Sequence, residues 1–251
     1  MSFSSCCLQT FTWGGTPTGK EVKLANHNSY VTGDNKDAAV LLIHDIFGWK
    51  YPNARLLADH YAREADVTVY VPDFFDGWVV DWKAVEEDRF HEIDLVGLAN
   101  THSREARGPE MEACAKALKS EHGFERLGAI GFCYGGWGVC HLASKARGEK
   151  LVDVISMGHP SWLVKDDIAN LTVPVQFLAP EIDPAFPAEL KTYTFETLLK
   201  LNLPFDYVHY PGIVHGGLVR GKETVARERE AMAAAKNSAV AWFKQHLHPA
   251  N

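Results

Sequence analysis

The chain has 251 residues, of which 46% are hydrophobic and 23% are charged, and its formal net charge is −7. This size and composition suit one globular domain with a large apolar core, so we expect a single domain over residues 1–251. A net-negative surface attracts neither nucleic acids nor anionic membranes, and we expect neither as a partner.

Targeting signals and cysteine usage favour a cytoplasmic protein. No stretch of ~18 apolar residues predicts a membrane span, and the first residues lack the charged and apolar segments of a secretory signal. The five cysteines are an odd number without C-x-x-C spacing, which favours reduced thiols over disulfides. We expect Cys114 and Cys140 to be small buried apolar residues, whereas no role is predicted for Cys6 and Cys7.

Apolar runs alternate with helical periodicity along the chain. The strands that we predict lie at 21–31 (an early antiparallel pair), 40–44, 67–71, 126–130, 152–157, 173–178 and 205–210. The predicted helices lie at 53–64, 108–123, 136–147, 187–202 and 223–246, and the irregular stretch 78–102 is expected to hold short helices that cap a binding site. This alternation predicts an α/β fold, with one doubly wound, mainly parallel sheet and helices on both faces.

The stretch Gly131-Phe132-Cys133-Tyr134-Gly135-Gly136 joins a predicted strand to a predicted helix. It matches the G-x-nucleophile-x-G turn of α/β-hydrolases, with cysteine in place of the usual serine. Such a turn strains the backbone of its central residue, and glycines beside it avoid collisions with neighbouring backbone. We therefore expect an exposed thiol at a helix N-terminus, where the helix dipole favours thiolate. A buried structural cysteine would leave the glycines without a purpose.

Two further residues complete a candidate triad with Cys133. Asp183 follows the strand predicted at 173–178, and His215 follows the strand predicted at 205–210. Nucleophile, acid and histidine in this order are typical of the α/β-hydrolase fold, which places its chemistry in loops after the strands. Glu181 is the rival of Asp183 for the acid. His209 lies on the preceding strand and is expected to be structural. No cluster of further ligands accompanies His209 and His215 to form a zinc site.

Five motifs in this order resemble those of the dienelactone hydrolase family, and the resemblance extends from about residue 20 to the last helix. The motifs are His44-Asp45-Ile46-Phe47-Gly48, Val71-Pro72-Asp73-Phe74-Phe75, the turn at Cys133, Asp183 and His215. The resemblance implies a small α/β-hydrolase in which Cys133 is the nucleophile, His215 the general base and Asp183 its orienting acid. It also implies that neither a cofactor nor a metal ion takes part.

The resemblance extends to the loop after the first core strand. In this family an acidic side chain at the position of Asp45 contacts the resting nucleophile, and bacterial members usually carry the longer glutamate there. Asp45 would hold the thiol neutral, activate it, or only cap the following helix. The backbone N–H groups of Ile46 and Tyr134 would form the oxyanion hole, and His44 is expected to stabilise the loop through hydrogen bonds.

Aromatic residues crowd the expected site. Most of them will pack in the core, and we expect Trp49, Phe75 and Tyr134 to line a pocket that suits a cyclic or conjugated substrate.

Bacterial members hold a substrate carboxylate with two arginines, and this chain departs from that pattern. Gly77 stands where one arginine is expected, whereas Arg220 lies close to the position of the other. Arg89, Arg104 and Arg107 are candidates to replace the missing cation. The pattern at Asp45, Gly77 and Arg220 looks more like the fungal branch of the family.

The leading hypothesis is a cofactor-independent hydrolase that cleaves a small lactone or ester through a thioester on Cys133, as a monomer or homodimer. One alternative is a non-hydrolytic cyclase, isomerase or lyase of secondary metabolism on the same scaffold, because a fold does not determine the chemistry. The other alternative is a non-catalytic ligand-binding or thiol-sensing protein.

Overall fold

The computed structural model describes residues 13–248 except 82–83, 86 and 88, so Cys6 and Cys7 lie outside the described residues. The described residues form an eight-stranded sheet with the order β1-β2-β4-β3-β5-β6-β7-β8. The first two pairings, β1 with β2 and β2 with β4, are antiparallel, and the others are parallel. The strands are β1 Lys20–Leu24, β2 His27–Thr32, β3 Ala38–Ile43, β4 Thr68–Pro72, β5 Arg126–Phe132, β6 Val154–Gly158, β7 Val175–Ile182 and β8 Phe205–Val214.

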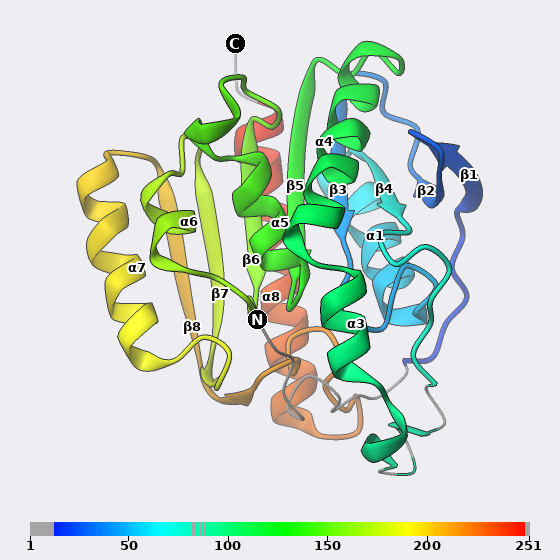
Figure 1. The fold of residues 1–251 in the computed structure, drawn as a ribbon, viewed down its shortest axis with the longest axis vertical. Coiled ribbons are helices and arrows are strands. Elements are labelled where there is room, and N and C mark those ends of the chain that lie inside the picture. Colours follow the sequence, from blue (N-terminus) through cyan, green and yellow to red (C-terminus); the bar gives the residue numbers. More distant parts are fainter. Residues whose placement is uncertain (1–12, 82–83, 86, 88, 249–251) are drawn as a thin grey trace.

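Helices cover both faces of the sheet (Figure 1). On the far face in this view, α1 (Pro52–Ala65) and α8 (Ala226–Leu247) pack against each other. The near face carries α4 (Arg104–Ser120), α5 (Gly135–Leu142), α6 (Lys165–Ala169) and α7 (Ala188–Leu201), with the short α3 (Leu95–Thr101) at the end of this layer. Short 3-10 helices span Phe90–Glu92 and Lys145–Arg147. The expected mainly parallel sheet between two helical layers is therefore confirmed.

Strand β3 shows how the sheet separates the core into two halves. All six of its residues are buried, as the apolar run 40–44 predicts for a strand covered on both faces. Successive side chains alternate between faces, so Leu41 and Ile43 join the cluster under α4 and α5, whereas Val40 and Leu42 join the cluster under α1 and α8. Gly128 in β5 lets α8 approach the sheet closely, because a Cβ at this position would meet the ring of Phe243 from α8.

Two predicted helix boundaries are wrong by four residues or more. Helix α4 begins before the Gly108-Pro109 pair that we take as its start, because the side chain of Ser103 caps it by accepting a hydrogen bond from Ala106 N. Pro109 therefore lies inside the helix, where it removes one backbone hydrogen bond.

The helix predicted at 136–147 ends at Leu142. The carbonyl oxygen of Ala143 accepts hydrogen bonds from the backbone N–H and the hydroxyl of Thr172, at 3.1 and 2.8 Å. Ser144 then caps a separate 3-10 turn through its side chain. The chain thus leaves the helix to join the segment before β7.

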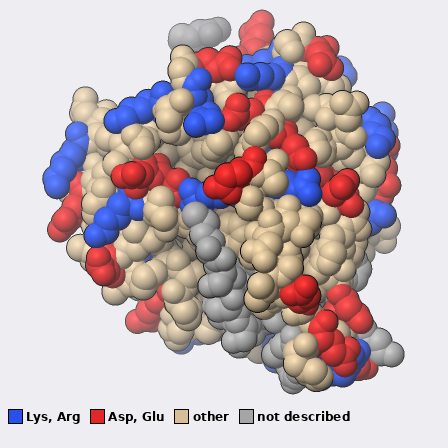
Figure 2. Space-filling model, viewed as in Figure 1, with Lys and Arg blue, Asp and Glu red and all other residues tan. Residues whose placement is uncertain are grey.

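The molecular surface mixes charges of both signs. On the face shown in Figure 2, acidic and basic side chains are interspersed. Surface ion pairs of the protein include Lys116–Glu149 and Arg147–Glu112. Within the described ranges, no helix combines the length and apolar character needed to cross a bilayer.

Candidate active site

A sharp turn between β5 and α5 carries Cys133. The backbone of Cys133 has a φ of 49°, in the left-handed region that non-glycine residues rarely adopt. A Cβ on Gly131 would overlap the carbonyl oxygen of Gly135, and a Cβ on Gly135 would overlap that of Ile43 in β3. Close backbone approach therefore requires both glycines, as the sequence pattern predicts.

The thiol of Cys133 lies between two polar side chains. Its Sγ is 3.3 Å from His215 Nε2 and 3.3 Å from Ser161 Oγ. The expectation of an exposed thiol is wrong, because Cys133 is fully buried. The thiol is nevertheless within reach of a base.

Asp183 fixes the orientation of the His215 ring. Its Oδ1 accepts hydrogen bonds from His215 Nδ1 at 2.8 Å and from the backbone N–H groups of Ala185 and Phe186 at 2.9 and 3.1 Å. An ionised carboxylate only accepts, so His215 carries its proton on Nδ1 and, when neutral, turns a lone pair on Nε2 toward the thiol. The rival acid, Glu181, is exposed and accepts from Gly212 N instead.

Ile46 and Tyr134 follow neighbouring strands at matching positions. Strands β3 and β5 are parallel and pair Ile43 with Gly131. Ile46 and Tyr134 each lie three residues beyond this pair, in the two loops that meet where Gly135 touches Ile43. Their backbone N–H groups are the donors that the family resemblance implies for an oxyanion hole.

His44 connects the loops that follow β3 and β4. Its Nε2 accepts a hydrogen bond from Phe74 N at 3.1 Å, so in the neutral ring its Nδ1–H donates to Asp45 O at 2.7 Å. Burial lowers the pKa of His44, which keeps the ring neutral. Both ring nitrogens are thus engaged by backbone, as expected for a residue that stabilises the loop.

Asp45 and Arg220 form a buried ion pair. Arg220 Nε lies 2.9 Å from Asp45 Oδ2, and the two side chains are 0% and 2% exposed. Asp45 Oδ1 accepts from Phe47 N, and the guanidinium of Arg220 lies 4.7 Å from the centre of the Phe47 ring. The structure therefore joins the residue expected at the thiol to the residue expected at a substrate carboxylate.

The remaining predicted pocket residues occupy separate places. Trp49 is buried beside α1, with the guanidinium of Arg55 at 4.8 Å from its ring. Phe75 and Tyr134 contact each other, with ring centroids 5.0 Å apart, and the Tyr134 hydroxyl donates to His102 O at 2.9 Å.

The arginines considered as replacement cations all face carboxylates. Arg89 pairs with Glu87 and Glu92, Arg104 with Asp167 and Arg107 with Glu110. Gly77 has a φ of 82°, a conformation in which an arginine would be strained.

Sequence reasoning missed Ser161 and His159. Both follow β6 in the segment Gly158-His159-Pro160-Ser161. The ring of His159 is fully buried and stands edge-on to His215, with centroids 4.9 Å apart. Burial, together with His215 and Arg220, holds the pKa of His159 well below its usual value, so its ring is neutral. Position after a core strand was the available signal for both residues.

Fold and site together define an α/β-hydrolase of the ester or lactone type. The chain belongs to the dienelactone hydrolase family, whose sequence model matches residues 28–247. Among the residues described, no group of three or more histidine, cysteine or acidic side chains is placed to hold a metal ion.

Individual relatives agree with this assignment. The chain is 30% identical to hydrolase tropI of Talaromyces stipitatus, over 97% of this chain and 96% of that protein. It is 30% identical to the carboxymethylenebutenolidase homolog of Homo sapiens, over 91% of each. The crystal structure of a putative dienelactone hydrolase from Klebsiella pneumoniae shares the fold, with a TM-score of 0.69 and 18% identity over 91% of this chain and 98% of that one.

Gly135→Ala tests the packing of the turn. The added Cβ would overlap the backbone of β3, so we expect the free energy of unfolding in urea to fall by about 3 kcal/mol or more. Gly14→Ala is the matched control, because a Cβ there meets open space. Equal stability of the two variants would contradict the packing described.

Ser161→Ala tests the contact at the thiol. A hydroxyl that donates to a thiolate stabilises it, so its loss should move the half-maximal rate of Cys133 alkylation by iodoacetamide to higher pH, by roughly one unit. Ser156→Ala is the control, since that buried hydroxyl donates to Gln176 instead. An unchanged profile in Ser161→Ala would show that the hydroxyl does not act on the thiolate.

Proposed function

We propose that this protein hydrolyses a small lactone or ester, without a cofactor, through a thioester on Cys133. One observation carries the proposal: the Cys133 thiol lies 3.3 Å from His215 Nε2, while Asp183 holds the opposite ring nitrogen at 2.8 Å. This is the nucleophile, base and orienting acid arrangement of triad hydrolases. Because the thiol is buried in the resting structure, the proposal requires local movement of covering side chains when substrate enters.

Acylation begins with transfer of the Cys133 proton to His215 Nε2. The thiolate then attacks the carbonyl carbon, and the carbonyl oxygen becomes an oxyanion that accepts from Ile46 N and Tyr134 N. Asp183 stabilises the imidazolium that forms. The C–O bond of the ester breaks, and the departing alkoxide takes the proton from His215, which leaves an acyl thioester on Cys133. In a lactone the resulting alcohol stays attached to the acyl group.

Deacylation reverses these proton movements with water. Neutral His215 takes a proton from a water molecule, which attacks the thioester carbonyl in the same oxyanion hole. The C–S bond breaks, the thiolate recovers its proton from His215, and the carboxylic acid leaves. Both half-reactions use one base and one pair of donors, so the single cluster supports the whole cycle.

Intact-protein mass spectrometry tests the nucleophile. Brief exposure to a panel of activated esters and small lactones should give a transient acyl adduct on the wild type, with release of acid. Cys133→Ala should give no adduct and should lose at least a thousandfold in turnover while remaining folded. Cys133→Ser should retain little activity, because the site is built to deprotonate a thiol.

Cys140→Ala is the matched control for this experiment. Cys140 is also buried in this region, and burial raises the pKa of its thiol well above the usual value. The Cys140→Ala variant should form the acyl adduct on Cys133 at the wild-type rate. Activity of Cys133→Ala within tenfold of wild type would exclude Cys133 as the nucleophile.

Asp183→Asn tests the orienting acid. An amide at this position does not hold His215 in the required tautomer, so we expect turnover to fall by about a hundredfold to ten-thousandfold. Glu181→Gln, which removes the exposed rival carboxylate, should stay within a few-fold of wild type. Steady-state kinetics of both variants with one ester decides which carboxylate is the orienting acid. A larger loss of turnover in Glu181→Gln than in Asp183→Asn would assign that role to Glu181.

A further inference from the structure

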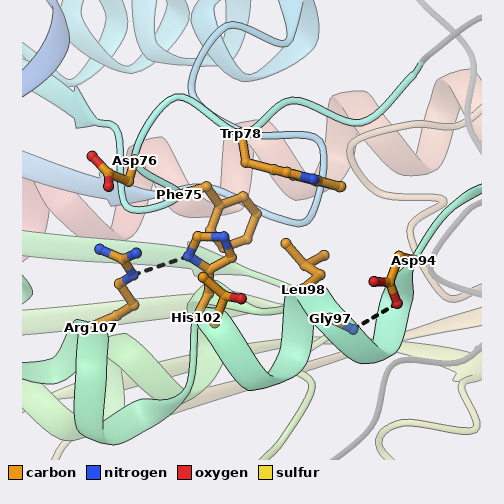
Figure 3. A pocket seen from close by; sticks show the side chains of 9 residues that line it. Phe75, Asp76, Trp78, Asp94, Gly97, Leu98, His102 and Arg107 are labelled. Atoms are coloured by element: carbon orange, nitrogen blue, oxygen red, sulfur yellow. Dashed lines mark hydrogen bonds between the residues drawn. The ribbon is translucent and has the colours of Figure 1, made fainter.

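A cavity of about 350 Å³ lies beside α3, and none of Cys133, Asp183 and His215 lines it. Its walls include side chains from the loop after β4 and from the region of α3, and Figure 3 shows them from close by: Phe75, Asp76, Trp78, Asp94, Leu98 and His102. This volume is within the range of small-molecule pockets.

The proton position on His102 is set by Arg107. Arg107 Nε lies 3.1 Å from His102 Nδ1 and donates to it. A guanidinium has only donors, so Nδ1 carries a lone pair and the neutral ring must carry its hydrogen on Nε2. Burial, with help from Arg107 and His44, lowers the pKa of His102 to about 4, so the ring is neutral at ordinary pH. His102 therefore offers an N–H donor at Nε2.

The orientation of the ring turns this donor away from Arg107. In Figure 3 the second ring nitrogen of His102 lies on the edge opposite the hydrogen bond to Arg107, toward Phe75 and the space beneath Trp78. The Phe75 ring packs on His102 with centroids 4.6 Å apart and on Trp78 with centroids 5.9 Å apart. The donor is thus set among aromatic faces, which favour a flat ring as the occupant.

The charges around the cavity disfavour a negatively charged occupant. Arg107 directs Nη1 to both carboxylate oxygens of Glu110, at 2.7 and 2.8 Å, so its charge is already balanced. Asp76 and Asp94 add two carboxylates to the lining. A substrate carboxylate would therefore meet like charge in this cavity, whereas a carbonyl oxygen would accept from His102 without that cost.

The cavity is close to the turn that carries Cys133. Phe75, which forms one wall, contacts the ring of Tyr134 at a centroid distance of 5.0 Å. The hydroxyl of Tyr134 also donates to the carbonyl oxygen of His102. A single layer of side chains thus connects the cavity with the residue that follows the nucleophile.

We propose that this cavity is a recognition subsite for an uncharged, flat ring that carries a carbonyl oxygen, and that the Nε2–H group of His102 donates to this oxygen. The assignment of the ring to the substrate rests on the proposed function. The subsite selects a neutral aryl ketone, ester or lactone over the corresponding carboxylate.

Isothermal titration calorimetry with two matched probes tests the subsite. Acetophenone and benzoate share one ring and differ in charge, and we expect the wild-type protein to bind acetophenone at least tenfold more tightly. His102→Phe retains a ring against Phe75 but loses the donor, so acetophenone should bind it at least fivefold more weakly. His209→Phe, at an exposed position on β8, is the control and should bind as the wild type does.

Several results would overturn the subsite: tighter binding of benzoate, no binding of acetophenone to the wild type, or equal affinity of a folded His102→Phe variant. The comparison of probes needs no variant, so it stands even where His102→Phe does not fold. Failure of the proposed function gives a different result. If the protein binds acetophenone as expected but forms no acyl adduct on Cys133, the subsite is supported and the hydrolase mechanism is contradicted.

Discussion

The left-handed backbone of Cys133 is the constraint on which the rest of the site depends. The turn closes only because Gly131, Gly135 and Gly136 let backbone and side chains approach where a Cβ would collide. Gly135 fits against the end of β3, and Gly136 fits against Pro160 in the loop after β6. One strained residue therefore sets the position of both neighbouring loops. The loop after β3 carries Ile46, and the loop after β6 brings Ser161 to the thiol. Backbone strain of this kind persists only where its surroundings determine it from several sides.

The ion pair between Asp45 and Arg220 is a second constraint, and it connects the loop after β3 to the segment after β8. Both side chains are buried, and a buried charge needs a partner because desolvation is costly. Arg220 and Asp45 therefore balance each other's charge within the chain. Under the proposed function, this pairing and the presence of Gly77, where bacterial relatives are expected to carry an arginine, favour neutral substrates over carboxylates. The neutral histidines His44, His102 and His159 add polar groups without adding charge, since burial lowers the pKa of each.

Local sequence signals predict most of the fold and part of the site. The apolar run 40–44 predicts a buried strand, and the glycines around Cys133 predict a strand-to-helix turn. Both signals could be used because hydrophobic patterning and backbone geometry act over a few neighbouring residues. The order of Cys133, Asp183 and His215 follows from chain topology and could be predicted as well. For Ser161 and His159 the sequence offers only their position after a core strand, because their contacts arise from the packing of Pro160 on Gly136 between distant segments. The start of α4 was also predicted wrongly, because the cap at Ser103 outweighs the helix-breaking tendency of Pro109.

The most direct test of hydrolysis is the fate of the oxygen atom from water. A lactone or ester that yields an acyl adduct is turned over in water enriched in ¹⁸O, and the product is analysed by mass spectrometry. Attack of water on a thioester inserts one ¹⁸O atom into the carboxyl group of each product molecule, and this is the result we expect. Conversion of the substrate to a product without ¹⁸O would contradict the account and would indicate cyclisation, isomerisation or carbon–carbon cleavage at the same oxyanion hole.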